Sequence, residues 1–261
     1  MCRDSIARHA IKNRTRSGKG SVMTGMLAGY MLLAGLIPAL ALAGPEEDAK
    51  AAQDRGDRAT AAIVRRALTH KDDADALYRL GALYRHGNGV KRDYDEALKW
   101  FRLAAALGSD QAQYSLADMY LRGFGVRQDL PTSAKWYTRA AEQGHIQAQL
   151  VLGLLYKLGG GVRKNYARAA IWYQRAAAQG HGEAQHELGL MYSSGRGVQQ
   201  DYLVAYKWQL LARSHTRSGP VRTAAQDALD QLKSRLSVSQ MAEAQRQANA
   251  WQAIPEGRRM P

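Results

Sequence analysis

The sequence has a single cysteine, Cys2, so no disulfide can form within one chain and the fold must be stable by packing alone. Neither an HExxH motif nor a cysteine–histidine cluster accompanies the histidines, so no metal site is expected. A Gly-x-Ser-x-Gly motif, the turn that exposes a serine nucleophile, is absent too. These absences predict a protein without catalytic residues, metal or cofactor.

Charge is missing from residues 21–45, where an apolar run ends in Ala41-Leu42-Ala43, and the residues before this run are polar and basic. This order is typical of a secretory signal peptide, here 1–43, cut after Ala43. The alternative is an uncleaved inner-membrane anchor, although Pro38 interrupts the run and its length is near the lower limit of a spanning helix. We therefore expect a periplasmic or secreted protein that meets the membrane only through this segment, if it stays uncleaved. Translation from Met23 is a further alternative.

Acidic side chains are outnumbered, because 37 lysines and arginines stand against 23 aspartates and glutamates, for a formal charge of +14. A surplus spread over polar helix faces favours acidic partners or surfaces in general. It does not indicate nucleic acid, and we expect no nucleic-acid partner.

One pattern recurs every 36 residues between Ala74 and Ala212. Its columns are an aromatic pair, two turn glycines, an acidic or amide residue, and small residues. The tryptophan column is Trp100, Trp136, Trp172 and Trp208, and the tyrosine column is Tyr84, Tyr120, Tyr156 and Tyr192. The glycine columns are Gly87, Gly123, Gly159 and Gly195, then Gly89, Gly125, Gly161 and Gly197. A fixed period of this length indicates a stacked solenoid rather than one closed core.

The four units, which we name Repeats 1 to 4, span Ala76 to Gly108, Ala112 to Gly144, Ala148 to Gly180 and Ala184 to Ala212. They resemble Sel1-like repeats, the relatives of the tetratricopeptide repeat. The resemblance implies an all-α, right-handed α-solenoid of antiparallel helix pairs over 73–215, in a family whose members mostly serve as adaptors for other proteins. A cysteine-rich branch of similar proteins is associated with β-lactam binding or hydrolysis, but its disulfide in each repeat is missing here.

Within a repeat, the residue types predict where each helix begins and ends. Gly87 supplies the left-handed residue that ends the first helix, and Asp93 with Glu96 predicts a capping box on the second. Pro131 fits the first turn of its helix, where a missing amide donor costs little. The second helix is predicted to bury Trp100, Leu103 and Ala104.

The flanks predict atypical terminal units, because one face of each meets water. Residues 44–72 read as a degenerate N-terminal helix pair, and residues 216–253 as C-terminal capping helices. Ser237 or Ser239 is the expected cap of the last helix, and 254–261 is expected to be a loose tail.

Two patterns have a functional and a structural interpretation. The Gly-x-Gly-Val turns invite comparison with phosphate-binding loops, but a helix precedes them and they recur in every unit, which favours tight turns. The aromatic columns suggest stacking surfaces for sugars or bases, but their fixed register on apolar helix faces favours packing between repeats.

In tetratricopeptide-like stacks the first helix of each pair lines the concave side, so the resemblance places a groove on these helices. The predicted partner-binding residues are Tyr78, Arg85, His86, Tyr114, Asp118, Arg122, Leu150, Leu154, Lys157, His186 and Leu190. These columns vary in size and charge between repeats, as a partner-specific surface would, and a solvated face is the alternative. Their mixture suits an extended or helical peptide of acidic character.

The sequence therefore predicts a non-catalytic protein-interaction scaffold or adaptor of the bacterial periplasm or cell envelope, with a protein or peptide partner. A binder of envelope polysaccharide or peptidoglycan is the second hypothesis, because basic and aromatic residues would serve it. A β-lactamase-like hydrolase is the weakest of the three.

Overall fold

The computed structural model describes residues 43–54 and 57–254, and these form helices joined by turns, without a strand among them. Residues 1–42 of the predicted signal peptide and 255–261 of the predicted tail lie outside the described residues. The architecture is an all-α repeat solenoid, as the period predicted. Two compact units divide the described chain, one ending at Ser109 and the other beginning at Asp110.

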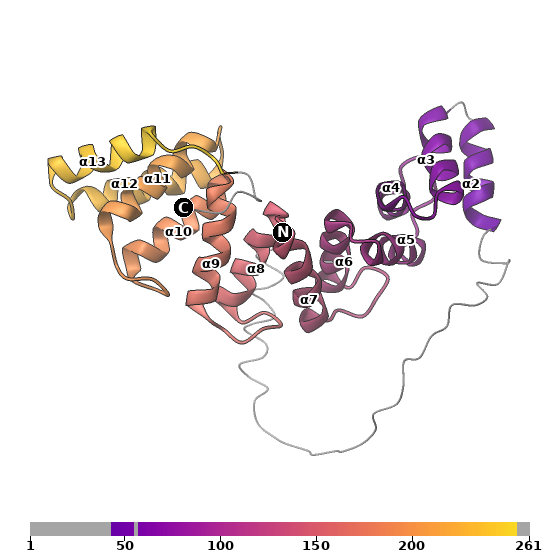
Figure 1. The fold of residues 1–261 in the computed structure, drawn as a ribbon, viewed down its shortest axis with the longest axis horizontal. Helices are drawn as coiled ribbons and strands as arrows, with labels where there is room; N and C mark the ends of the chain where they lie inside the picture. The colour runs from indigo at the N-terminus through magenta and orange to yellow at the C-terminus, as the bar shows by residue number, and fades with distance from the viewer. Residues whose placement is uncertain (1–42, 55–56, 255–261) are drawn as a thin grey trace, which may run out of the picture. The chain divides into compact units, whose positions relative to one another are not determined.

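The N-terminal unit consists of two helix pairs (Figure 1). They are α2 (Ala43–Asp54) with α3 (Arg58–Thr69), and α4 (Ala74–His86) with α5 (Tyr94–Ala106), the pair of Repeat 1. The helices α3 and α4 also contact each other. The Tyr84 hydroxyl of α4 donates a 2.6 Å hydrogen bond to Asp48 of α2, and burial raises the pKa of this phenol. The leading pair is thus bonded to Repeat 1.

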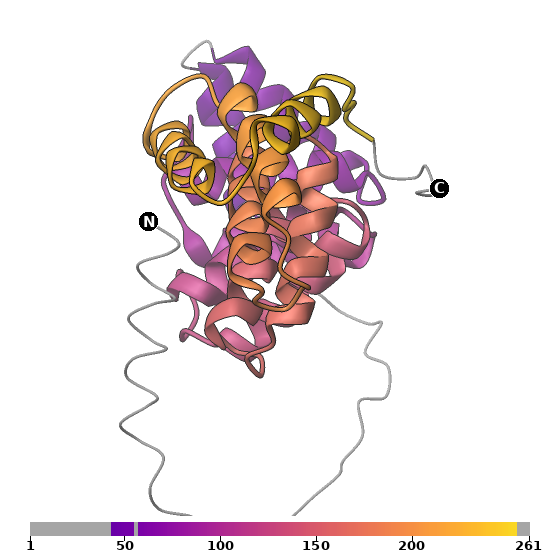
Figure 2. The ribbon, with the colours of Figure 1, turned by 90° about the vertical axis from the view of Figure 1, so that its left-hand side faces the viewer.

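The C-terminal unit contains Repeats 2 to 4 and two further helices (Figure 2). Its helices are α6 (Asp110–Arg122), α7 (Leu130–Glu142), α8 (Ile146–Leu158), α9 (Tyr166–Ala178), α10 (Gly182–Ser194), α11 (Tyr202–His215), α12 (Pro220–Lys233) and α13 (Val238–Asn249). Each helix contacts the next along the repeats, while α12 and α13 both pack on α11. The last two helices cover the apolar face that Repeat 4 would otherwise expose.

The two turn glycines have different roles. Gly159 has a φ of 82° and ends α8 in the left-handed conformation, as predicted for this column. Gly161 has a φ of 76°, and a Cβ placed there would lie 2.2 Å from the Leu130 carbonyl oxygen at the start of α7. The second glycine therefore lets one turn rest on the backbone of the preceding repeat.

The buried rings lie one position after the tryptophans. Phe101, Tyr137 and Tyr173 are at most 1% exposed, and the ring of Phe101 lies against Gly81 as that of Tyr173 lies against Gly153. The prediction for Trp100 and Ala104 is confirmed, since both are buried, but the prediction for Leu103 is wrong, since it is 41% exposed. The helix turns Phe101 inward in its place.

The caps follow the predictions with one exception. The Asp93 carboxylate accepts hydrogen bonds from the backbone amides of Asp95 and Glu96, but the Glu96 side chain bonds Lys99 and the Trp100 indole instead of returning to the cap. The predicted capping box of α5 is therefore wrong. Ser237 forms a complete capping box on α13 with Gln240.

Candidate functional site

The predicted partner-binding positions lie on the first helix of each repeat, α4, α6, α8 and α10, and we call their side chains the first-helix face. These helices are held by columns that do not vary. The alanines Ala76, Ala112, Ala148 and Ala184 and the leucines Leu80, Leu116, Leu152 and Leu188 are at most 2% exposed. Apolar burial of this kind contributes about 25 cal/mol per Å². The face is therefore mounted on a packed core.

On α4, the Tyr78 ring is half-buried and lies 5.8 Å from the Phe101 ring. Arg85 is half-buried and His86 is exposed. Repeat 1 thus places an aromatic ring and two basic side chains at the predicted positions of the N-terminal unit.

On α6, the half-buried Tyr114 ring stacks on the His145 ring at 4.6 Å, with an angle of 11° between their planes. Asp118 is 4% exposed, and its carboxylate accepts a 2.6 Å hydrogen bond from Arg122 Nε. The structure therefore brings the predicted residues Asp118 and Arg122 together as an ion pair whose acid is inside and whose cation is at the surface.

On α8, Leu150 is half-buried and Leu154 is 9% exposed. Lys157 Nζ lies 2.5 Å from an oxygen of Glu187, a carboxylate of α10 that is 3% exposed. This ion pair joins Repeat 3 to Repeat 4. The sequence reasoning missed Glu187, because in the other repeats its column holds Arg79, Ser115 and Val151.

On α10, His186 is 8% exposed and its Nδ1 lies 2.8 Å from the Gln209 side-chain oxygen, so it belongs to the packing. Leu190 is exposed and lines a pocket of about 410 Å³ with Ser193, Tyr202, Leu232 and others from α10 to α12. The first-helix face of the C-terminal unit thus ends, at its last repeat, in a small pocket with an apolar wall.

Two histidines cap first helices. The Nδ1 of His145 accepts the Ala148 amide hydrogen at 3.2 Å, and that of His181 accepts the Ala184 amide hydrogen at 3.3 Å. Burial lowers the pKa of both imidazoles. A lowered pKa favours the neutral imidazole, which is the only form with a lone pair that can accept a backbone amide hydrogen at the start of the helix.

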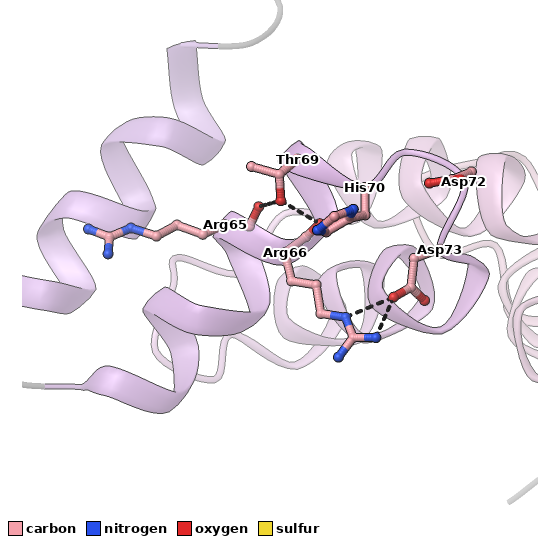
Figure 3. Close-up of a pocket in the computed structure, with 6 residues that line it drawn as sticks. All are labelled: Arg65, Arg66, Thr69, His70, Asp72 and Asp73. Atoms are coloured by element: carbon pink, nitrogen blue, oxygen red, sulfur yellow. Dashed lines mark hydrogen bonds and ion pairs between the residues drawn. The ribbon is translucent and has the colours of Figure 1, made fainter.

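An open depression of about 510 Å³ lies in the N-terminal unit beside Arg65, Arg66, Thr69, His70, Asp72 and Asp73. Figure 3 shows Arg66 turned toward Asp73, which it meets through two nitrogens at 2.8 and 2.7 Å, while Arg65 extends away. The Asp73 carboxylate also accepts the Ala76 amide hydrogen at the start of α4. These charges join α3 to α4 and do not converge on a ligand.

The described residues also bear on metal binding and on membrane insertion. No group of three or more histidine, cysteine, aspartate or glutamate side chains there is arranged to hold a metal ion. Among the same residues, no helix has the length and apolar character needed to cross a bilayer.

Comparison with known protein families matches four copies of the Sel1 repeat to residues 74–109, 110–145, 146–181 and 182–213. These bounds coincide with the helix pairs α4–α5, α6–α7, α8–α9 and α10–α11. The chain belongs to the Sel1 repeat family. Sel1 repeat proteins typically serve as protein-interaction scaffolds and are generally non-catalytic.

Two solved Sel1 repeat structures are similar to this chain. One is a protective antigen of uropathogenic Escherichia coli with an SLR fold, at 32% identity and a TM-score of 0.65, covering 79% of this chain and 45% of that one. The other is a Sel1 repeat protein from Oxalobacter formigenes, at 26% identity and a TM-score of 0.64, covering 79% and 85%. The chain thus spans less than half the length of the Escherichia coli antigen. No curated protein matches the sequence significantly.

The Sel1 repeats also carry a ladder of buried amides that the sequence reasoning missed. Gln149 is fully buried; its nitrogen donates to the Ala141 carbonyl at 3.1 Å and its oxygen accepts from Gln179 at 2.9 Å. Gln113 with Gln143, and Gln185 with His215, repeat the second contact. The 36-residue spacing of these pairs could have indicated them in the sequence. Repeat 1 has Leu77 and Leu107 at the two corresponding positions, so the pair is absent from that repeat.

Proposed function

We propose that this Sel1 repeat protein is a non-catalytic scaffold of the bacterial cell envelope, and that it binds a protein or peptide partner through its first-helix face. One contrast carries the proposal. The leucine column that holds the first helices is constant and buried, whereas the column two residues earlier is Tyr78, Tyr114, Leu150 and His186. Packing explains the first column and also His186, but it does not call for the change from tyrosine to leucine at the three half-buried positions of the second column.

The charged groups of this face are held in place before a partner arrives. The buried carboxylates of Asp118 and Glu187 fix Arg122 and Lys157, each of which keeps about 30% of its side chain exposed. A side chain that is already ordered loses less conformational entropy on binding. Eight of the eleven predicted residues are half-buried or exposed, while Asp118, Leu154 and His186 would act through the side chains that they support.

A polysaccharide would need open aromatic faces, and the second helices offer two half-buried indoles, Trp136 and Trp172. The guanidinium carbon of Arg139 lies 4.5 Å from the centre of the Trp136 ring, and that of Arg175 lies 4.9 Å from the Trp172 ring. Because each indole already has a cation over one face, the structure favours a protein partner over a sugar chain.

The envelope location rests on the signal-peptide pattern of residues 1–43. We expect amino-terminal sequencing of the protein recovered from the periplasm to begin at Gly44. Recovery in the cytoplasm with the segment intact would contradict this part of the proposal.

Photocrosslinking in cells tests the face itself. A photoreactive phenylalanine analogue placed at Tyr114 or Leu150 should give a discrete adduct with one protein. The same residue placed at Ile171, which is 55% exposed on α9, is the matched control and should not give that adduct.

A second variant separates binding from folding. Tyr114→Ala with Leu190→Glu should abolish the adduct from Leu150 while leaving the far-ultraviolet circular dichroism spectrum unchanged. Equal adducts from Ile171 and Leu150, or none from any position on the face, would overturn the proposal.

A further inference from the structure

The turn of Repeat 3 carries a group of cations and tyrosines that we call the Repeat 3 basic patch, formed by Tyr156, Lys164, Tyr166, Arg168 and Arg196. Lys164 Nζ lies 4.9 Å from the centre of the Tyr166 ring, and the Arg196 guanidinium carbon lies 6.0 Å from it. Arg168 donates a 3.2 Å hydrogen bond to the Tyr156 hydroxyl. Two tyrosines thus interact with three exposed cations, which come from two repeats.

The backbone fixes this arrangement. A Cβ added to Gly197 would lie 2.3 Å from the carbonyl carbon of Tyr166, so the turn of Repeat 4 sits directly on the start of α9. Arg196, which precedes that glycine, is therefore carried to the Tyr166 ring by backbone contact.

The same ten turn positions can be compared between the four repeats. In Repeat 3, residues 159–168 contain three cations and no acid. Residues 87–96 contain two cations and three acids, and residues 123–132 and 195–204 contain one of each. The positive charge is therefore a property of one repeat and not of the fold.

Asn165 accounts for part of this difference. It caps α9 by accepting the Arg168 amide hydrogen at 3.0 Å, as the carboxylates of Asp129 and Asp201 cap α7 and α11. The amide does the same structural task without the negative charge that the other three repeats carry at this position.

In the described part of the chain, none of these three cations forms an ion pair with a carboxylate, and each interacts with a tyrosine side chain. The hydrogen bond from Lys164, with the nearby charges of Lys164, Arg196 and Lys157, lowers the pKa of the Tyr166 phenol. Tyr156 of the patch and Lys157 of the first-helix face are consecutive residues of α8, so the patch adjoins that face.

We infer that the Repeat 3 basic patch anchors an acidic segment, rich in aspartate or glutamate, of the protein that occupies the first-helix face. The inference rests on the proposed function. Carboxylates of the partner would bind the guanidinium groups of Arg168 and Arg196 in place of water. The tyrosine rings would keep these cations oriented for carboxylate binding. A protein segment is favoured over an acidic polysaccharide because the patch continues into the face through Lys157.

The sharpest test is Asn165→Asp, which restores the charge of the other repeats and keeps the cap. The probe is a fluorescein-labelled peptide of alternating glutamate and serine, with its glutamine counterpart as the uncharged control, measured by fluorescence anisotropy with the purified protein. We expect the variant to weaken binding of the glutamate peptide by about threefold to tenfold with an unchanged melting temperature.

A charge-matched comparison excludes a general effect of net charge. Lys164→Gln with Arg168→Gln and Arg196→Gln should weaken binding by at least about tenfold. Arg127→Gln with Lys135→Gln and Arg217→Gln removes the same charge elsewhere in the C-terminal unit, at exposed positions, and should change binding by less than about twofold. Equal losses in both triple variants, or no loss in either, would overturn the inference. Tighter binding of polygalacturonate than of the peptide, at equal carboxylate concentration, would overturn the choice of a protein segment.

The two proposals fail separately. If the adduct formed from Leu150 in cells persists at full yield in Asn165→Asp and in the Repeat 3 triple variant, the patch is not part of the binding site but the scaffold function stands. If no position on the first-helix face gives an adduct, the scaffold function fails and the anchoring inference falls with it, whatever the peptide shows.

Discussion

The buried amide ladder makes a quantitative prediction through Gln149→Glu, a substitution that changes one NH2 group to oxygen and leaves the shape the same. The Gln149 side chain is fully buried, and its nitrogen donates to the Ala141 carbonyl at 3.1 Å. An ionised carboxylate would set a negative oxygen against that carbonyl, away from water. We expect the introduced carboxyl to stay protonated in the folded protein, because burial and the carbonyl both raise its pKa.

The sign and size of the effect follow from proton linkage. The folded variant holds a proton that the unfolded chain releases once the pH exceeds the ordinary pKa of glutamate, so its stability falls as the pH rises. The slope is about 1.4 kcal/mol for each pH unit. Between pH 4.5 and pH 7, the variant should therefore lose about 3 kcal/mol relative to the wild type measured at the same pH.

Urea unfolding followed by circular dichroism at 222 nm, at both pH values, measures this difference. Gln174→Glu is the control, because Gln174 is exposed on the neighbouring helix α9, and its stability should follow that of the wild type. A Gln149→Glu protein whose stability relative to the wild type does not change with pH would show that the ladder is not buried as described.

Three further predictions concern the turns, the caps and the pair between repeats. Gly161→Ala should destabilise the protein by about 2 kcal/mol more than Gly159→Ala in urea unfolding, because both residues have positive φ but only the first would meet a backbone oxygen at 2.2 Å. Because burial lowers the pKa of His145 and His181, the unfolded chain binds protons first and stability falls in acid; replacing both with asparagine should reduce the loss between pH 7 and pH 5 by about 1–2 kcal/mol, and an unchanged pH profile would refute the capping role. Lys157→Met removes the cation beside a buried carboxylate and should cost about 2 kcal/mol in urea unfolding, whereas no loss would mean that the ion pair adds nothing.

The period of the sequence was sufficient to predict the helix pairs and most of their ends. Gly87, Pro131 and Ser237 act as their residue types predict, because a left-handed turn, a missing amide donor and a hydroxyl cap are local properties. The innermost ring column was harder to see, since it reads Phe101, Tyr137, Tyr173 and then Gln209, while the constant tryptophans beside it drew the prediction.

The candidate surface was predicted only in outline. Sequence spacing gives the direction of a side chain around its helix but not how far the neighbouring repeat covers it. His186 and Asp118 are therefore buried although their columns looked accessible. The Lys157–Glu187 pair joins residues on different helices, and no pattern within one helix indicates it. Whether the predicted positions bind a partner stays a prediction.

The glycine contact between repeats also limits how such a gene can change in length. Gly197 rests on the start of α9 just as Gly161 rests on the start of α7, at the same separation along the chain. Deleting residues 146–181, which is one whole repeat, would place Gly197 on Leu130. Repeat 4 would then pack on Repeat 2 through the contact that Repeat 3 now makes with Repeat 2. Insertions and deletions of one whole 36-residue repeat can therefore be accommodated. A change of a few residues would instead replace the glycine at this contact by a residue whose side chain meets the neighbouring backbone.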